Sequence, residues 1–481
     1  MFLQSLPPLP FTVAVEPPTF AEVLRCLRRP WFWLFLLVAT SAGAGFLVVR
    51  QRLDARRVSE AGTLQVSTEP SGARVLVDGK TRAQTPAFMA VASGRHVIRL
   101  QRPGFADATF SVRAQTNAPV QIDARLWRSH PDVNQLRPTV PGTTVANAQF
   151  LSDGRVAITV AFPSGNQQIW VVDADGHNQP VGPSQPTIRA ALTASGNVIA
   201  TAAAASTAGY ASRANQVWTA NASDQSLGKK IYEVDGAADA EVTDLAWAPD
   251  GAHLRIAVAS HPSSGTQTNL LWTSGDSNDT SHLVQIPGEV VAGSYSWLAD
   301  AKAVAFLVRT QASVALCVLQ LPVGSLHYLS DASQSTGNAI PFPPLTWSPD
   351  GGEVLYQAGQ GANGIGLGWF SGKPETPLFV AKVDGSQSHR LPGPGAQFPV
   401  WRRDGSLAGF AKDDSGKPLS LVSLSPPNSG QVLAQLPLQT TSQLAARWDL
   451  QRDQALLAVT RGTGFNAPDY WWVRFATENA Q

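Results

Sequence analysis

The residues whose types and spacing could do chemistry are few, and most lie in turns. Asp173-Ala174-Asp175-Gly176-His177-Asn178 gathers oxygen and nitrogen ligands in one short segment, as a Ca²⁺ loop does. An EF-hand loop also needs a bidentate Glu downstream, and none is placed there, so turn chemistry explains these residues better. The acidic segments Asp276–Asp279 and Asp413-Asp414 are read as solvated loops for the same reason. We therefore expect no metal site.

A second candidate is Gly359-Gln360-Gly361-Ala362-Asn363-Gly364, which fits the G-x-G-x-x-G pattern of phosphate-binding loops. A nucleotide site needs a helix N-terminus directly after this loop, so that backbone amides face the phosphate. The glycine-rich segment 365–368 and the later Lys373-Pro374 cannot supply that helix. The sequence therefore predicts a flexible loop and no bound cofactor.

Catalytic signatures are also missing from the sequence. The eight His residues are scattered, with no H-E-x-x-H pair, and no G-x-S-x-G elbow occurs. Cys26 and Cys317 lie far apart and form no metal or redox spacing. We expect no catalytic residue, and we expect that the chain is not an enzyme.

Length and composition indicate a turn-rich chain with more than one core. The 481 residues exceed an ordinary single core, only 15% are charged, and Gly 40 and Pro 35 signal many turns. The formal net charge of +1 favours neither a nucleic-acid partner nor an acidic substrate. No nucleic acid is expected as a partner.

An apolar segment near the N-terminus predicts a membrane anchor. Residues 1–29 form a Pro-rich tail, expected to be cytoplasmic, and 30–50 are expected to form a transmembrane helix. Trp31–Val49 carries no charge, and as a helix it would reach roughly 28 Å, close to the thickness of a bilayer core. A signal peptide cleaved near Ala42-Gly43-Ala44 is the alternative, but the apolar run continues past that point.

The charges around this segment leave its orientation open. Residues 51–61 are expected to form a juxtamembrane linker. Arginines on the linker side slightly outnumber those before the span, which by itself favours a cytoplasmic C-terminal bulk. These residues are Arg25, Arg28 and Arg29 before the span, and Arg50, Arg52, Arg56 and Arg57 after it.

Residues 62–127 alternate in strand fashion, with apolar side chains at Leu64, Val66, Val75 and Val77. The segment resembles the PEGA family, although Ala83 stands where a Gly is usual. The resemblance implies a small β-sandwich, found largely on bacterial and archaeal envelope proteins, with no catalytic residues to carry over. The residues that carry it include Pro70, Gly72, Ala73, Asp78, Gly79, Thr85, Pro86, Gly94 and Gly104.

From residue 138 to 481, after a polar segment read as a linker over 128–137, the chain repeats itself. A bulky residue followed by a polar turn recurs at intervals of about 50 residues. The clearest copies contain Trp247, Asp250 and Gly251; Trp297 and Asp300; Trp347, Asp350 and Gly351; and Trp401, Asp404 and Gly405. A second strand signature follows each turn, as in Gln168–Asp173.

Two strand pairs in each repeat amount to four strands, the content of one β-propeller blade. The sequence therefore predicts an all-β chain with a propeller of seven blades, with six or eight as open alternatives. One blade could be split between the chain ends. The motif resembles TolB-like, WD-repeat-like propellers of bacterial envelopes. The tryptophans are expected to pack blade against blade.

Both resemblances imply an envelope protein, and with the apolar segment Trp31–Val49 they lead us to expect a membrane-anchored, extracytoplasmic binding or scaffold protein. Its expected partner is a protein or an envelope polymer held by propeller loops near 201–215, 259–268, 331–343 and 358–376. A propeller-type hydrolase or lyase, with its site at the channel mouth, is one alternative. Convergence of His, Asp and Arg in one pocket would favour that alternative. A cytoplasm-facing scaffold is the other.

Overall fold

The computed structural model describes the chain from residue 61 to residue 476, with interruptions. The described residues are 61–116, 118–185, 189–203, 214–224, 228–234, 240–260, 267–274, 282–290, 294–309, 313–321, 324–333, 345–357, 378–384, 386–391, 396–402, 405–411, 418–425, 429–439, 444–449, 451–459 and 468–476. Within these ranges the regular elements are all strands, which confirms the predicted all-β class there.

The expected tail, transmembrane helix and most of the juxtamembrane linker, residues 1–60, lie outside the described residues. Across the described part of the chain, no helix has the length and apolar character that crossing a bilayer requires.

The first seven strands form two sheets in the region of the PEGA resemblance. Their orders are β4-β1-β7 and β3-β2-β5-β6. Apolar side chains alternate along the strands, so that Val75 and Val77 of β2 are buried between exposed or half-buried neighbours. The strands are β1 (Ala61–Glu69), β2 (Arg74–Val77), β3 (Lys80–Gln84), β4 (Ala87–Ala92), β5 (Gly94–Gln101), β6 (Ala108–Ala114) and β7 (Val120–Arg125).

The chain divides into two compact units, and the division runs through these seven strands. One unit comprises residues up to Gln65, Ala87–His96 and Ser111–Ile122. The other comprises Val66–Pro86, Val97–Phe110 and everything from Asp123 onward. Each unit is described by itself below.

Motif residues of the PEGA resemblance hold one another in the larger unit. Gly72 donates its backbone N–H to Thr85 O (2.8 Å), and the Thr85 hydroxyl accepts from the Ala73 N–H (3.0 Å). Asp78 accepts from the Val97 N–H at 2.9 Å, and it shares a left-handed turn with Gly79. The turn residues therefore serve the sheet, which agrees with their structural role in the sequence pattern.

Beyond residue 131, the described strands form seven antiparallel sheets, which we number along the chain. The first three are β9 (Thr144–Phe150), β10 (Val156–Ala161), β11 (Gln167–Val172) and β12 (Asn178–Gln185); β13 (Arg189–Leu192), β14 (Val198–Ala203), β15 (Gln216–Asn221) and β16 (Lys229–Glu233); and β17 (Ala240–Trp247), β18 (His253–Ser260), β19 (Gln267–Ser274) and β20 (His282–Pro287).

The fourth sheet has five strands, because its first strand is split into two short pieces that both pair with β23. The remaining sheets are β21 (Glu289–Val290), β22 (Ser296–Trp297), β23 (Ala303–Arg309), β24 (Ser313–Gln320) and β25 (Ser325–Ser333); β26 (Leu345–Trp347), β27 (Glu353–Gln357), β28 (Leu378–Lys382) and β29 (Ser388–Leu391); β30 (Ala396–Trp401), β31 (Leu407–Ala411), β32 (Pro418–Ser423) and β33 (Val432–Gln439); and β34 (Leu444–Asp449), β35 (Gln454–Val459), β36 (Asp469–Arg474) and β8.

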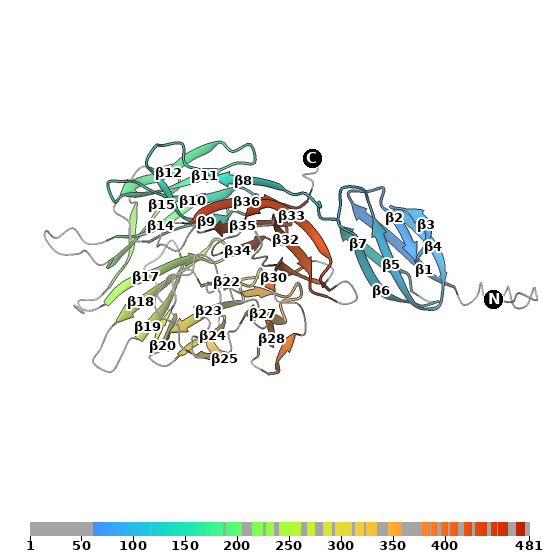
Figure 1. Ribbon diagram of the computed structural model, residues 1–481. Helices are drawn as coiled ribbons and strands as arrows, with labels where there is room; N and C mark the ends of the chain where they lie inside the picture. Colours follow the sequence, from blue (N-terminus) through green and yellow to red (C-terminus); the bar gives the residue numbers. More distant parts are fainter. Residues whose placement is uncertain are drawn as a thin grey trace, which may run out of the picture. The chain divides into compact units, whose positions relative to one another are not determined.

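The last sheet takes its outer strand from far upstream. Strand β8 (Asp132–Leu136) pairs antiparallel with β36, with Asn134 opposite Trp472, and the two strands lie side by side in Figure 1. These residues were expected to form part of the linker over 128–137. They form a strand instead, for two reasons. The edge of β36 is free to pair with them, and the side chain of Leu136 becomes buried in the core.

Alternate side chains of each sheet pack against two different neighbours. In β18, Ile256 lies in a buried cluster with Ala200 and Val217 of the second sheet. The next residue, Ala257, lies in a cluster with Phe306 of the fourth sheet. The seventh sheet meets the first, where the Tyr470 hydroxyl donates to Ala146 O at 3.0 Å. The sheets therefore close into a ring.

Candidate functional site

Charged side chains from several sheets gather around the first strands of the ring. Asp244 lies on β17 and Arg447 on β34, which are the first strands of the third and seventh sheets. The negative charge of Asp244 lies close enough to Arg447 to act on its guanidinium, where it opposes the lowering of the pKa by burial. Arg189, on β13, donates from Nε to Thr243 O on β17 at 2.7 Å. Polar contacts therefore connect first strands at the centre of the ring.

Arg255 of β18 is the most deeply buried charge of this cluster, at 1% exposure. Its guanidinium lies over the Tyr295 ring and 5.9 Å from the centre of the Trp297 ring. Nη2 is 3.9 Å from Asp244 Oδ2, too far for a hydrogen bond, and Nε, Nη1 and Nη2 have no hydrogen-bond partner. Ring stacking and charge attraction therefore hold this side chain in place.

Arg447 as a whole residue is half-buried, whereas Arg255 is almost completely buried. Burial lowers the pKa of its guanidinium to about 10, and nearby Tyr470 and Asp244 offset part of the shift. Burial raises the pKa of the Tyr470 phenol to about 12, against the opposing effect of Arg447. These side chains lie where the seventh sheet closes on the first.

The two arginines and two tyrosines of the cluster each keep one protonation state near neutral pH. Burial raises the pKa of the Tyr295 phenol and lowers the pKa of Arg255, whose guanidinium still stays charged in proteins. Arg447 stays protonated and Tyr470 neutral, since their values of about 10 and about 12 lie well above 7. The cluster can therefore present positive charge and phenol hydroxyls, and these four groups do not exchange protons near neutrality.

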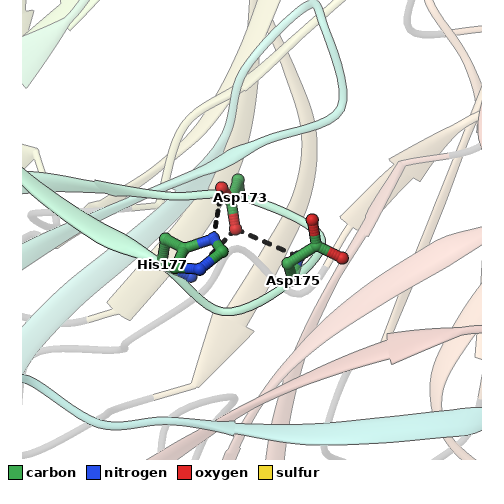
Figure 2. A group of neighbouring side chains, drawn as sticks. All are labelled: Asp173, Asp175 and His177. Carbon is green, nitrogen blue, oxygen red and sulfur yellow. Dashed lines mark hydrogen bonds and ion pairs between the residues drawn. The ribbon is translucent and has the colours of Figure 1, made fainter.

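A separate group of potential metal ligands lies in the turn between β11 and β12. Ligand atoms of Asp173, Asp175 and His177 all lie within 4.8 Å of one another, and Figure 2 shows the three side chains around the turn. The Asp173 carboxylate accepts from the backbone N–H groups of Asp175 (3.0 Å) and His177 (2.8 Å), and it contacts His177 Nδ1 at 3.1 Å. The backbone N–H of His177 is the main reason that the pKa of Asp173 is lowered.

The turn between β17 and β18 contains a similar Asp–His contact. Asp250 accepts from the backbone N–H groups of Ala252 (2.9 Å) and His253 (3.2 Å), and its other oxygen lies 2.7 Å from His253 Nδ1. An Asp–His contact thus also forms in a turn that is not among the groups of three potential metal ligands in the described residues. The group at Asp173 therefore gives no ground for proposing a metal.

The tryptophans predicted to pack between blades fall into two kinds. Two of them, and also Trp448 of the seventh sheet, donate Nε1–H to a carbonyl of the preceding sheet. The contacts are Trp247 to Ala191 O (3.3 Å), Trp347 to Ser296 O (3.2 Å) and Trp448 to Phe398 O (3.3 Å).

The other two tryptophans, Trp297 and Trp401, are half-buried, as is Trp448. Trp297 packs against the cluster around Phe306 and lies near Arg255. Trp401 packs against the cluster around Leu407, and its buried Nε1 has no hydrogen-bond partner.

The remaining residues of the repeat pattern lie in turns. Asp300 accepts from the Lys302 N–H at 3.0 Å and Asp350 from the Gly352 N–H at 3.1 Å. Gly251, Gly351 and Gly405 have φ values of 69°, 71° and 76°, which favour glycine. Asp404, the G-x-G-x-x-G segment 359–364, the acidic pairs near 276 and 413, and most of the four predicted contact loops lie outside the described residues.

Within the PEGA region, the remaining motif residues are also structural. Ala73 is completely buried and Gly104 has a φ of 81°. Pro70 lies in the turn after β1, Pro86 directly precedes β4, and Gly94 begins β5 with a φ of 139°.

Sequence reasoning missed the cluster at the centre of the ring. Its signal is a charged or phenolic residue within an apolar strand, as at Arg255 in HLRIAVAS and Arg447 in LAARWD. Such a residue must be paired or solvent-accessible in the folded chain. The pattern could have flagged the positions, but not their convergence.

Comparison with known proteins identifies one part of the chain. Residues 61–130 match the PEGA domain family. No curated protein matches the sequence significantly.

Several solved structures are similar at low sequence identity. An oligogalacturonate lyase in complex with manganese is 12% identical, with 79% of this chain and 96% of that chain covered and a TM-score of 0.46. The β-propeller domain of the Trilobed protease from Pyrococcus furiosus is 12% identical, with coverages of 70% and 99% and a TM-score of 0.40. TolB from Acinetobacter baumannii is 15% identical, with coverages of 63% and 61% and a TM-score of 0.33.

These scores are low, and they carry no argument about function. The fold rests on the order and closure of the sheets themselves. The chain thus carries a PEGA domain at residues 61–130, followed by a ring of sheets like those of β-propellers.

Proposed function

We propose that this protein is a membrane-anchored binding or scaffold protein. Its PEGA domain and its ring of sheets would face the extracytoplasmic side and contact a protein or an envelope polymer. The PEGA match and the closed ring support a binding fold. The uncharged segment Trp31–Val49 supports the anchor.

The observation that carries binding over proton-transfer catalysis is the fixed protonation of the arginines and tyrosines in the central cluster. A general acid or base works best with a pKa near the operating pH. Arg447, at about 10, and Tyr470, at about 12, are far from that range. A permanently charged guanidinium is instead suited to holding an acidic group of a partner.

Orientation is tested by protease treatment of intact cells and of lysed cells. Digestion of the C-terminal bulk in intact cells, once the outer permeability barrier is opened, is the expected result. Digestion only after the cytoplasmic membrane is broken would contradict the extracytoplasmic orientation and favour the cytoplasm-facing scaffold.

Binding is tested with the full chain in detergent micelles, incubated with solubilised envelope proteins and with acidic envelope polymers. We expect retention of a partner, and weaker retention by Arg447→Met. Arg155→Met is the matched control, because Arg155 pairs with Asp153 in an exposed turn. Equal loss in both variants would show that the central guanidinium has no special role.

A propeller-type enzyme remains the second candidate, and one observation favours it. Asp244, two arginines and two tyrosines converge at the centre of the ring, and fixed cations and phenols can stabilise negative charge that develops during a reaction. The described part of the cluster contains no His. Turnover of peptide, ester or polysaccharide substrates by the full chain, abolished in Tyr470→Phe, would favour the enzyme over the binding protein.

A further inference from the structure

Strand β4 (Ala87–Ala92) forms one edge of the three-stranded sheet β4-β1-β7. Its sequence, AFMAVA, contains no charge, no proline and no glycine. An edge strand exposes a row of backbone N–H and C=O groups, which can pair with a strand of another chain. Proteins usually block such pairing with charged residues, prolines or bulges.

The other edges of these two sheets follow that rule. Edge strand β3 carries Lys80 and Arg82, β6 carries Arg113, and β7 carries Asp123 and Arg125. Three edges are therefore protected by charge, and β4 is the exception among the described edges of these sheets.

The side chains of β4 are also unusually open to solvent. Phe88 is 74% exposed, Ala90 is exposed on the same face, and Met89 and Val91 on the other face are only half-buried. Exposure of a large aromatic side chain to water is unfavourable, so covering it would stabilise any complex. At the end of the strand, His96 Nε2–H donates to Ala92 O at 2.7 Å, which leaves Ala87–Val91 as the open stretch.

The segment that enters this sheet is a chemically poor cover for β4. Residues 51–60 lead directly into β1, and half of them are charged: Arg52, Asp54, Arg56, Arg57 and Glu60. Placing these side chains beside an uncharged apolar strand would desolvate charges without partners. The β4 strand of a second copy is itself uncharged and apolar, so it could cover β4 without burying a charge.

We propose that two copies of this chain pair through β4, antiparallel, so that their three-stranded sheets join into one continuous sheet. A two-fold axis makes such an interface self-complementary. Directly opposite residues must share a face of the sheet. The two-fold axis must therefore lie where one residue faces its own copy, and not between two successive residues.

Centring the axis on Met89 uses the whole open stretch. Phe88 then lies opposite Ala90 of the second copy on the exposed face, a large side chain beside a small one. Ala87 lies opposite Val91, and no like charges meet across the pair. So short a strand buries a small area, so the association is weak and depends on concentration.

The first test measures the mass of the full chain in detergent micelles by sedimentation over a range of concentrations. We expect a monomer–dimer equilibrium for the wild-type chain. Phe88→Lys should shift it at least tenfold towards monomer, because the new charges would be desolvated at the interface. Thr81→Lys, on the exposed and already charged edge β3, is the matched control and should dimerise like wild type.

A wild-type chain that stays monomeric at every concentration would overturn the proposal. So would a dimer that survives Phe88→Lys, since the contact would then lie elsewhere. Phe88 is mostly exposed, and circular dichroism verifies that the variant folds. These outcomes do not depend on the orientation in the membrane or on the partner proposed above.

The second test fixes the register. In a Cys26→Ser background, Met89→Cys places two thiols directly opposite, at a Cα separation that permits a disulfide. Mild oxidation should cross-link most of this variant and little of the Thr81→Cys control. Equal cross-linking of both variants would contradict pairing through β4. Monomers that instead capture an added extended peptide, and lose it in Phe88→Lys, would assign the edge to a different partner.

Discussion

At the residue scale, the buried Arg255 shows how this ring holds a charge without ordinary hydrogen bonds. Its guanidinium stacks on the Tyr295 ring and lies 3.9 Å from the Asp244 carboxylate. Removing one partner of a buried ion pair leaves the other uncompensated, whereas replacing both by apolar groups can be nearly neutral. Variants of Asp244 and Arg255 therefore test whether the stability of the fold depends on pairing these two charges.

We predict that Asp244→Asn lowers the free energy of unfolding by about 3–5 kcal/mol, because Arg255 would keep a buried charge without its carboxylate. The double variant Asp244→Asn/Arg255→Met should recover much of that loss. Urea denaturation followed by circular dichroism measures both. A single variant as stable as wild type would mean that Asp244 does not compensate Arg255.

Two tryptophans provide a matched pair at the same scale. Trp247→Phe removes the Nε1–H group that donates to Ala191 O. The loss of this hydrogen bond should lower the free energy of unfolding by about 1 kcal/mol. Trp401→Phe removes an Nε1–H that is buried without a partner, so the lost hydrogen bond contributes nothing there. The volume change is the same in both variants. We expect the lower thermal midpoint for Trp247→Phe, and the reverse order would contradict the assigned bond.

At the scale of elements, the repeat turns define the strands but not every partner. A turn such as Ser348–Gly351 joins β26 to β27 in register, with Trp347 opposite Val354. Both strands lie next to each other in sequence, so local turn chemistry settles their pairing. Strand β8 has no such turn to β36, and its segment DVNQL is polar enough to resemble a linker.

The pairing of β8 predicts that residues in the expected linker affect stability. Leu136→Ala should cost about 2–5 kcal/mol, because this side chain is buried in the main core cluster. Asn134→Ala, on the same strand but exposed, should change stability by less than about 0.5 kcal/mol. Thermal unfolding of the full chain distinguishes them. Equal, small effects would mean that β8 is not part of the folded ring in solution.

At the scale of the whole molecule, the ring's core includes a residue from the end of the PEGA region. Trp127 stacks on Trp448 with 6.1 Å between ring centres and on Phe475 with 5.1 Å. The Arg402 guanidinium lies over the same indole at 4.6 Å. Trp127 belongs to the same buried cluster as Phe410 of the sixth sheet.

We predict that Trp127→Ala lowers the unfolding free energy of the ring by about 3–5 kcal/mol. Phe88→Ala, at an exposed position of the PEGA region, should change it by no more than about 0.5 kcal/mol. Denaturation followed by near-ultraviolet circular dichroism reports on the aromatic packing directly. A Trp127→Ala ring with unchanged stability and spectrum would show that this stack is dispensable.

The sequence by itself was enough for the all-β class, the PEGA region and the period of about 50 residues. These features depend on local properties: alternation along a strand, turn residues at fixed offsets, and repetition along the chain. Trp247 and Asp250 could be located in this way because their roles belong to one hairpin and its neighbour.

Only the tertiary structure decided which distant residues meet. Closure of the ring brings Arg447 of the seventh sheet close to Asp244 of the third, and β8 joins β36 across most of the chain. A charged residue within a strand shows that a partner or solvent access is needed, but its spacing does not name the partner. That choice depends on how the sheets stack around the centre, which is a property of the folded ring.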